Sequence, residues 1–168
     1  MSLKGGSRAL VLDHFLPYRM SFTSNLVSDL IARTYGALFG LTIPEWRLVA
    51  VIAETGGITQ GEIGQRTRMD KVTVSRAAIA LVSRGLLERL ANEDDRRSHH
   101  LVLTEAGRML HATTAPKALD IERRIFAHFD GDEVERFEAM LRRIDQIAFD
   151  LAAEEEQRKA GEQARQQG

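Results

Sequence analysis

Two closely spaced helix starts constrain the fold of this 168-residue chain more than any other feature. At the first, Thr59 and Glu62 have the spacing of a capping box, in which each side chain satisfies a backbone amide of the first helical turn. At the second, Asp70 is a favourable N-cap residue. Only residues 66–69 separate the two expected helices, and this is the spacing of a helix-turn-helix.

The second helix, expected over residues 70–84, has one apolar face and one face suited to DNA. The apolar stripe, expected in the core, comprises Val74, Ala78, Leu81 and Val82. Small polar, methyl-bearing and cationic residues surround the start of the other face, as entry into a major groove requires. These candidate contacts are Lys71, Val72, Thr73, Ser75 and Arg76. An ordinary amphipathic surface helix shows the same pattern, so this helix alone leaves both interpretations open.

A charged hairpin is predicted directly after this helix. Gly85 is suited to a left-handed helix end, residues 86–90 and 99–103 are expected to be strands, and residues 91–98 form the turn between them. The turn carries adjacent arginines, and an arginine at a hairpin tip can enter a minor groove. A charged tip that is merely solvated would look the same.

Three segments of this region together resemble the MarR family of winged-helix transcription regulators. They are GLL at 85–87, DRR at 95–97 and LVLTEAG at 101–107, in the family's order and spacing without a gap. The resemblance covers most of residues 20–150. It implies a mainly α-helical fold with a small two-stranded β wing, in which helices from both chain ends form a homodimer.

The resemblance also implies a partner and a set of contacts. A dimer of this kind binds a pseudo-palindromic operator in double-stranded DNA and regulates transcription, here expected as a cytoplasmic repressor. By position, Lys71, Val72, Thr73, Ser75 and Arg76 would read the major groove. In the wing, Arg97 would enter the minor groove, Asp95 would orient it, and Arg96 would contact phosphate.

The rest of the chain is divided by composition and periodicity. Residues 1–20 are expected to be an expression leader followed by an N-terminal arm. Residues 21–40 and 104–153 would be dimerisation helices, and residues 41–103 the winged helix-turn-helix. From residue 154 the chain is polar and is expected to be disordered.

The last two helices carry the clearest patterns outside the DNA-binding region. Pro116 should kink or restart the helix that begins after Thr104. The final helix, expected from Asp132, has an apolar seam with alternating steps of three and four, which is typical of packing against another helix. The seam comprises Val134, Phe137, Leu141, Ile144, Ala148 and Leu151. Packing within the same chain would produce the same seam.

The resemblance further suggests a small aromatic or phenolic acid as effector, bound between the dimerisation helices and the winged helix. An aromatic wall with one cationic or hydrogen-bonding group suits an aromatic carboxylate. The candidate lining residues are Phe22, Tyr35, Phe39, Trp46, Arg47 and His111. Each aromatic residue is also well suited to the core or the dimer interface.

Composition and motifs weigh against other classes. Although the net charge is −1, residues 66–97 hold eight Lys/Arg against five acids, so the helix-turn-helix region is locally basic. The chain has no cysteine, which excludes disulfides and thiol redox sensing. No phosphate loop, HExxH or serine elbow is present, so neither an enzyme nor a cofactor is expected. No apolar run is long enough for a membrane span.

Two other binding functions stay open at this stage. A winged helix can bind protein without reading DNA, and loss of the basic face would favour that alternative. A metal-responsive regulator would need a histidine cluster. The five histidines include no His-x3-His helix pair, so no metal site is predicted.

Overall fold

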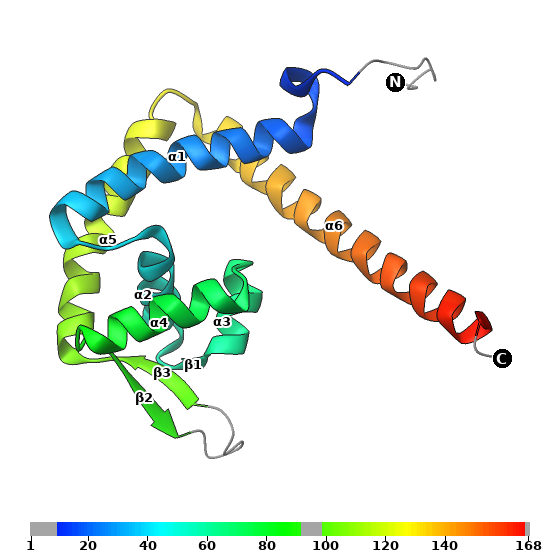
Figure 1. Cartoon of the computed structure of the whole chain (residues 1–168). Coiled ribbons are helices and arrows are strands. Elements are labelled where there is room, and N and C mark those ends of the chain that lie inside the picture. Colours follow the sequence, from blue (N-terminus) through cyan, green and yellow to red (C-terminus); the bar gives the residue numbers. More distant parts are fainter. Residues whose placement is uncertain (1–9, 92–98, 167–168) are drawn as a thin grey trace. The chain divides into compact units, whose positions relative to one another are not determined.

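The computed structural model describes residues 10–91 and 99–166, apart from the side chains of residues 34, 35, 37, 38 and 164–166. It divides into two compact units, residues 1–121 and 122–168, each of which is described by itself. The elements in chain order are a 3-10 turn Leu12–His14, α1 Leu16–Phe39, α2 Ile43–Thr55, β1 Ile58–Thr59, α3 Gln60–Thr67, α4 Lys71–Ser83, β2 Leu87–Ala91, β3 His99–Leu103, α5 Glu105–Phe126 and α6 Gly131–Gln166 (Figure 1).

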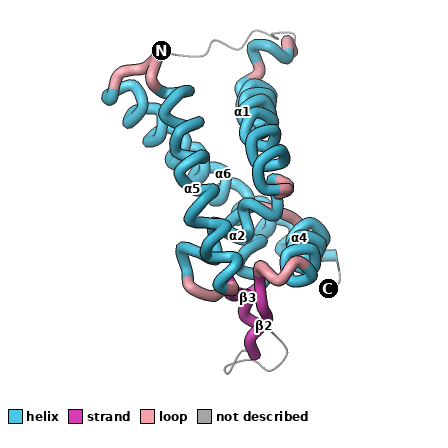
Figure 2. The backbone as a smooth tube through the Cα atoms, turned by 90° about the vertical axis from the view of Figure 1, so that its left-hand side faces the viewer, coloured by secondary structure: helices cyan, strands magenta, loops and turns pink. Residues whose placement is uncertain are grey.

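The sheet of the first unit is antiparallel and has three strands in the order β1-β3-β2. Leu101 of β3 lies opposite Ile58 of β1, and Leu103 lies opposite Leu87 of β2. The predicted β2–β3 pair is confirmed and projects from the helical part of the unit (Figure 2). The two-residue strand β1 was not predicted, because two residues show no alternating pattern.

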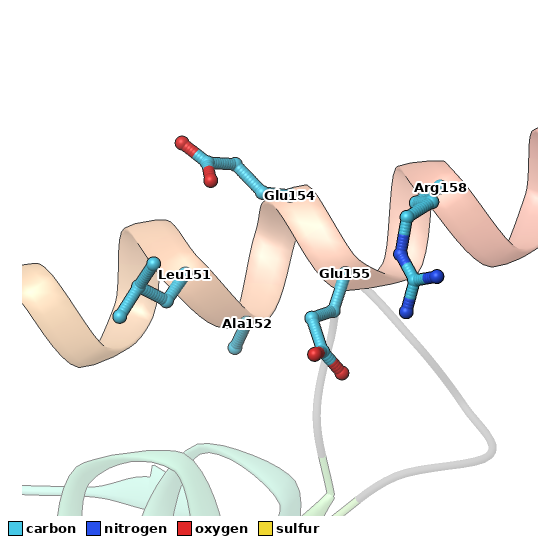
Figure 3. Close-up of a pocket in the computed structure, with 5 residues that line it drawn as sticks. All are labelled: Leu151, Ala152, Glu154, Glu155 and Arg158. Carbon is cyan, nitrogen blue, oxygen red and sulfur yellow. The ribbon is translucent and has the colours of Figure 1, made fainter. Parts of the chain in front are cut away.

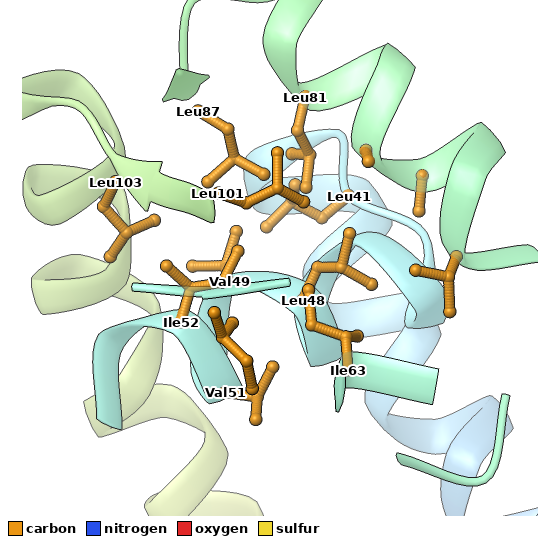
Figure 4. Packing of buried hydrophobic residues seen from close by; sticks show 14 residues of the cluster. Leu41, Leu48, Val49, Val51, Ile52, Ile63, Leu81, Leu87, Leu101 and Leu103 are labelled. Carbon is orange, nitrogen blue, oxygen red and sulfur yellow. The ribbon is translucent and has the colours of Figure 1, made fainter. Parts of the chain in front are cut away.

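The core lies between the helix-turn-helix, α2 and the sheet (Figure 4). From α2 the fully buried side chains of Leu48 and Ile52 enter it, and Ile63 of α3, Leu81 of α4 and Leu101 of β3 meet them. The predicted apolar stripe of α4 is confirmed, since three of its residues are buried and the fourth packs against the core. α4 therefore has one face fixed in the core and the opposite face in solvent.

Two helices of the first unit differ from expectation. α1 begins at Leu16 rather than at residue 21. Pro17 is compatible with this earlier start, because in the first turn of a helix the backbone N–H that proline lacks would not be hydrogen-bonded within the helix. α5 continues through Pro116, so the predicted restart is wrong. The helix is packed on both sides of the proline, since Thr114 is fully buried and Ile121 is nearly buried.

The helix α6 of the second unit is longer than expected. A capping box starts it, in which the amide of Glu133 donates to Asp130 (2.8 Å) and the amide of Asp130 donates to Glu133 (3.0 Å). The predicted disordered tail from residue 154 is wrong as far as Gln166, because the helix extends there. Ion pairs one turn apart support this polar end, such as Arg158–Glu162 at 3.2 Å. None of the described helices is long and apolar enough to cross a membrane.

Candidate nucleic-acid interface

Both predicted helix starts of the helix-turn-helix are confirmed. At α3, the amide of Thr59 donates to the carboxylate of Glu62 (2.9 Å), and the amide of Glu62 donates back to the Thr59 hydroxyl (3.3 Å). At α4, the amide of Thr73 donates to the Asp70 carboxylate at 2.9 Å. These caps fix where each helix begins, so they also fix which residues of α4 stand at its amino end.

The turn between α3 and α4 is tight and cationic. Arg68 adopts a left-handed conformation with φ of 56°, and a Cβ built on Gly64 would lie 3.2 Å from the carbonyl oxygen of Met69. Arg66 and Lys71 are exposed on either side of this turn. Positive side chains therefore gather around the amino end of α4, which itself carries partial positive charge.

The solvent face of α4 holds most of the predicted major-groove contacts. Lys71, Val72 and Arg76 are exposed, and Val72 retains 57% of its accessible surface. The sequence analysis missed Ile79, which is 56% exposed on the same face. Its helical spacing from Val72 and Arg76 was the signal that could have identified it. An exposed branched apolar side chain beside an arginine can contact a thymine methyl while the arginine binds guanine.

The environment of Thr73 limits the role that was predicted for it. Its hydroxyl donates to the second carboxylate oxygen of Asp70 at 2.6 Å. A hydroxyl has one proton, so in this conformation Thr73 offers DNA its methyl group and lone pairs but no donor. Thr73 and Ser75 are both half-buried. A phosphate contact from Thr73 would therefore cost the helix cap one of its hydrogen bonds.

Hydrogen bonds at the caps lower two carboxyl pKa values. The hydroxyl and then the amide of Thr73 hold the pKa of Asp70 below its usual range, and those of Thr59 do the same for Glu62. A carboxyl whose pKa is depressed by folding stabilises the folded state above its unfolded pKa. That contribution is lost as pH falls through the folded pKa.

The helix-turn-helix should therefore lose stability in acid partly through its caps. In Asp70→Asn the amide oxygen still caps α4 but cannot be protonated. We expect the melting temperature of the variant to be somewhat lower than that of the wild type at pH 7, because the amide nitrogen cannot accept the Thr73 hydroxyl. Below about pH 4 it should fall less steeply than that of the wild type. Circular-dichroism melts across this range measure the two slopes. Parallel slopes would exclude Asp70 as a source of the acid sensitivity.

The tip of the predicted wing lies outside the described residues. Asp95, Arg96 and Arg97 belong to it, so their proposed roles rest on position in the sequence alone. The strands that lead to the tip are described, with Ala91 paired to His99 at its base. The hairpin thus follows the carboxyl end of α4 directly, as a wing must.

Of the predicted effector residues whose side chains are described, Trp46 and Arg47 share a hollow, and Phe22, Phe39 and His111 do not line it. The ring of Trp46 stacks on that of His111 with centroids 6.0 Å apart and an interplanar angle of 14°. Trp46 and Arg47 line a hollow of about 380 Å³ between α2 and α3. Phe22 lies exposed on α1, where its ring is 6.2 Å from that of Tyr18. Phe39 packs against the core, and the side chain of Tyr35 is outside the description.

A second hollow, of about 430 Å³, lies along α6 (Figure 3). All its lining residues fall between Leu151 and Arg158 on this one helix. A single helix face cannot enclose a small molecule, so this hollow is not a ligand site. Within residues 10–91 and 99–166, no three His, Asp or Glu side chains lie together as a metal site would need.

A helix-turn-helix whose second helix exposes a basic face, followed by a two-stranded hairpin, defines a winged-helix DNA-binding fold. Comparison with known proteins agrees. Residues 39–98 match the sequence model of the MarR family. The transcriptional regulator HosA of Escherichia coli O111:H- is 26% identical over 113 residues, which cover 67% of this chain and 84% of HosA.

Two solved structures are also similar. A probable transcriptional regulator from Pseudomonas aeruginosa aligns with a TM-score of 0.69 and 29% identity, over 80% of this chain and 99% of that one. A mutant of E. coli MarR, crystallised with operator DNA, aligns with a TM-score of 0.70 and 22% identity, over 77% and 92%. The chain belongs to the MarR family of winged-helix transcription regulators.

Proposed function

We propose that this regulator is a homodimeric repressor that binds a pseudo-palindromic operator with α4 in the major groove and the β2–β3 wing in the minor groove. The observation that carries the proposal is the exposed face of Lys71, Val72 and Arg76 at the capped amino end of α4. The opposite face of α4 is buried, so this face is presented by a rigid support. The E. coli MarR structure with operator DNA shares the fold.

The individual contacts follow from chemistry and position. Arg76 would bind guanine through its guanidinium fork, Val72 would contact a thymine methyl, and Lys71 and Ser75 would reach nearby phosphates. In the wing, Arg97 would enter the minor groove, with Asp95 orienting it and Arg96 on phosphate. Thr73 would contribute its methyl group, because its hydroxyl proton is held by Asp70.

Uncovered apolar surface in both units supports the dimer. On α6 the side chains of Phe137, Ile144 and Leu151 repeat along one stripe and are 44%, 42% and 56% exposed. On α1, Leu26 and Leu30 are 61% and 48% exposed. Helices with such stripes pack against a partner helix rather than remain in water. A second copy of this chain provides matching stripes, and a two-fold interface well above about 2,000 Å² is expected.

Selection of bound duplexes from a random DNA pool tests the proposal as a whole. An inverted repeat with half-sites one helical turn apart, about 10 base pairs, is the expected result. It would support DNA reading, two-fold symmetry and half-site spacing together. Recovery of no common sequence, at salt concentrations where the protein still binds DNA, would contradict the proposed operator recognition. A promoter–reporter assay then distinguishes repression from activation.

The hollow between α2 and α3 is a different place from the predicted junction with the dimerisation helices, because all its lining residues belong to α2 and α3. Its lining of Trp46 and Val51, with Arg47 and Arg66 as cations beside the carboxylate of Glu54, favours a small aromatic acid as effector. An effector that prefers the geometry unable to bind DNA should raise the operator dissociation constant by about 5–150-fold at saturation. Fluorescence titration with salicylate and 4-hydroxybenzoate, with and without operator, measures this coupling. A panel of aromatic acids that binds nowhere would remove the effector from the proposal.

A further inference from the structure

The side chain of Arg84 joins three helices at a single point. It follows the last residue of α4, and its Nη1 donates to the carbonyl oxygen of Gly40 at 2.9 Å. Its Nη2 donates to the carbonyl oxygen of Phe39, the last residue of α1, at 3.2 Å. The same Nη1 lies 3.7 Å from a carboxylate oxygen of Glu45 in the first turn of α2. The recognition helix is thus linked to the end of a helix that precedes it by more than 30 residues.

Each partner of Arg84 carries negative or partial negative charge. The last carbonyls of a helix have no intrahelical donor and carry partial negative charge, which a guanidinium offsets. Gly40 adopts a left-handed conformation with φ of 59°, which ends α1 and leaves its carbonyl directed at Arg84. The side chain of Glu45 is only 10% exposed and also accepts the amide of Thr42 at 2.8 Å. Arg84 therefore places an opposite charge beside a largely buried carboxylate, and removing one partner of such a pair is costly.

We propose that Arg84 is a positioning residue that fixes the recognition helix to the carboxyl end of α1 and so sets the distance between the two recognition helices of the dimer. The inference rests on the proposed dimer and operator. If α1 is part of the dimer interface, a rigid link from α1 to α4 transmits the geometry of that interface to the DNA-reading face. Lysine would be a poor replacement for Arg84, because its single flexible nitrogen does not have the fixed, planar pair of donor nitrogens with which Arg84 binds the two carbonyl oxygens.

The spacing between operator half-sites tests this role directly. Insertion or deletion of one base pair moves a half-site by about 3.4 Å and rotates it by about 34°. The wild-type dimer should therefore bind the respaced operators at least about fivefold more weakly than the selected one. Fivefold is about the lower end of the typical coupling between two binding sites, here the two half-sites. In Arg84→Met, which keeps the apolar stem, this spacing penalty should shrink to about twofold or less. Affinity for the selected operator should also fall, because α4 is no longer held at one distance.

Two further variants separate positioning from stability. Arg108 makes a similar fork, to the carbonyl of Leu103 at 2.8 Å and to Glu105, but joins α5 to β3 rather than α4 to α1. Arg108→Met should therefore keep the wild-type spacing penalty even if its melting temperature falls. Glu45→Gln retains the cap on Thr42 through its amide oxygen and should reduce the penalty partly.

Each outcome has a clear meaning. A full spacing penalty in Arg84→Met dimers would overturn the inference. A loss of the penalty in Arg108→Met equal to that in Arg84→Met would also overturn it, because general destabilisation would then be the cause. A wild-type protein that binds one half-site as tightly as the whole operator would contradict the proposed function itself, and the inference with it.

Discussion

The Gly107→Ala variant is expected to lose a large part of the stability of the winged helix. A Cβ built at Gly107 lies 2.1 Å from the carbonyl oxygen of Leu86. This oxygen belongs to the backbone, so it cannot be moved by a change of side-chain rotamer. That carbonyl also accepts the amide of Thr104 (3.1 Å), whose hydroxyl donates to Gly85 (2.7 Å). The start of α5 is therefore clamped against the turn after α4. Overpacking against so rigid a neighbour should lower the free energy of unfolding by about 3 kcal/mol or more.

Chemical denaturation followed by circular dichroism measures this loss. Gly161→Ala is a matched control, because a Cβ at Gly161 has no heavy atom within 4 Å. In the helix α6, this change should leave stability unchanged or raise it by up to about 1 kcal/mol. A Gly107→Ala protein within about 0.5 kcal/mol of wild type would mean that α5 can separate from Leu86 at little cost.

The second large effect is expected on assembly, in Ile144→Asp. Ile144 lies in the middle of the exposed stripe of α6, between Phe137 and Leu151. Covering an isoleucine side chain contributes about 1.5–3 kcal/mol. Because a two-fold interface contains the residue twice, the variant should weaken the dimer by about 3–6 kcal/mol before the cost of burying aspartate is added. Analytical ultracentrifugation should show dimer for the wild type and monomer or unfolded protein for the variant.

Ala139→Asp is the control for charge. It adds one negative charge to the same helix, on an exposed position outside the stripe, and should leave the dimer intact. A folded wild-type monomer at micromolar concentration would contradict the proposed dimer. Equal dissociation of both variants would show that added charge, rather than loss of the apolar stripe, disrupts assembly.

The DNA-binding region could be predicted from the sequence because its structure is local. The capping residues at Thr59 and Asp70 act within one helical turn, so each helix start is determined by neighbouring residues. The apolar stripe of α4 has a helical period, so the face left in solvent followed from the same pattern. Resemblance to the MarR family supplied the wing and the order of the elements.

Features that depend on distant contacts could not be predicted. The strand β1 exists because Ile58 pairs with Leu101, and two residues alone carry no strand pattern. The end of α6 was expected to be disordered from its polar composition, but ion pairs one turn apart accompany its helix. The link from Arg84 to Phe39 spans 45 residues, and no sequence spacing indicates it. The effector residues were grouped by analogy, and the structure brings together only some of them.

The most direct test of sequence-specific DNA binding is the specificity ratio of Arg76→Ala. Wild type and variant are titrated with the selected operator and with random duplex at one salt concentration, and the ratio of the two dissociation constants is compared. Loss of a guanine contact should reduce the free-energy difference between operator and random binding, which this ratio measures, by about 1–3 kcal/mol per half-site. Binding to random duplex itself should change less. Arg158→Ala, which removes one positive charge from α6, should leave the ratio unchanged. An Arg76→Ala protein with the wild-type ratio would contradict the assignment of α4 as the helix that reads DNA.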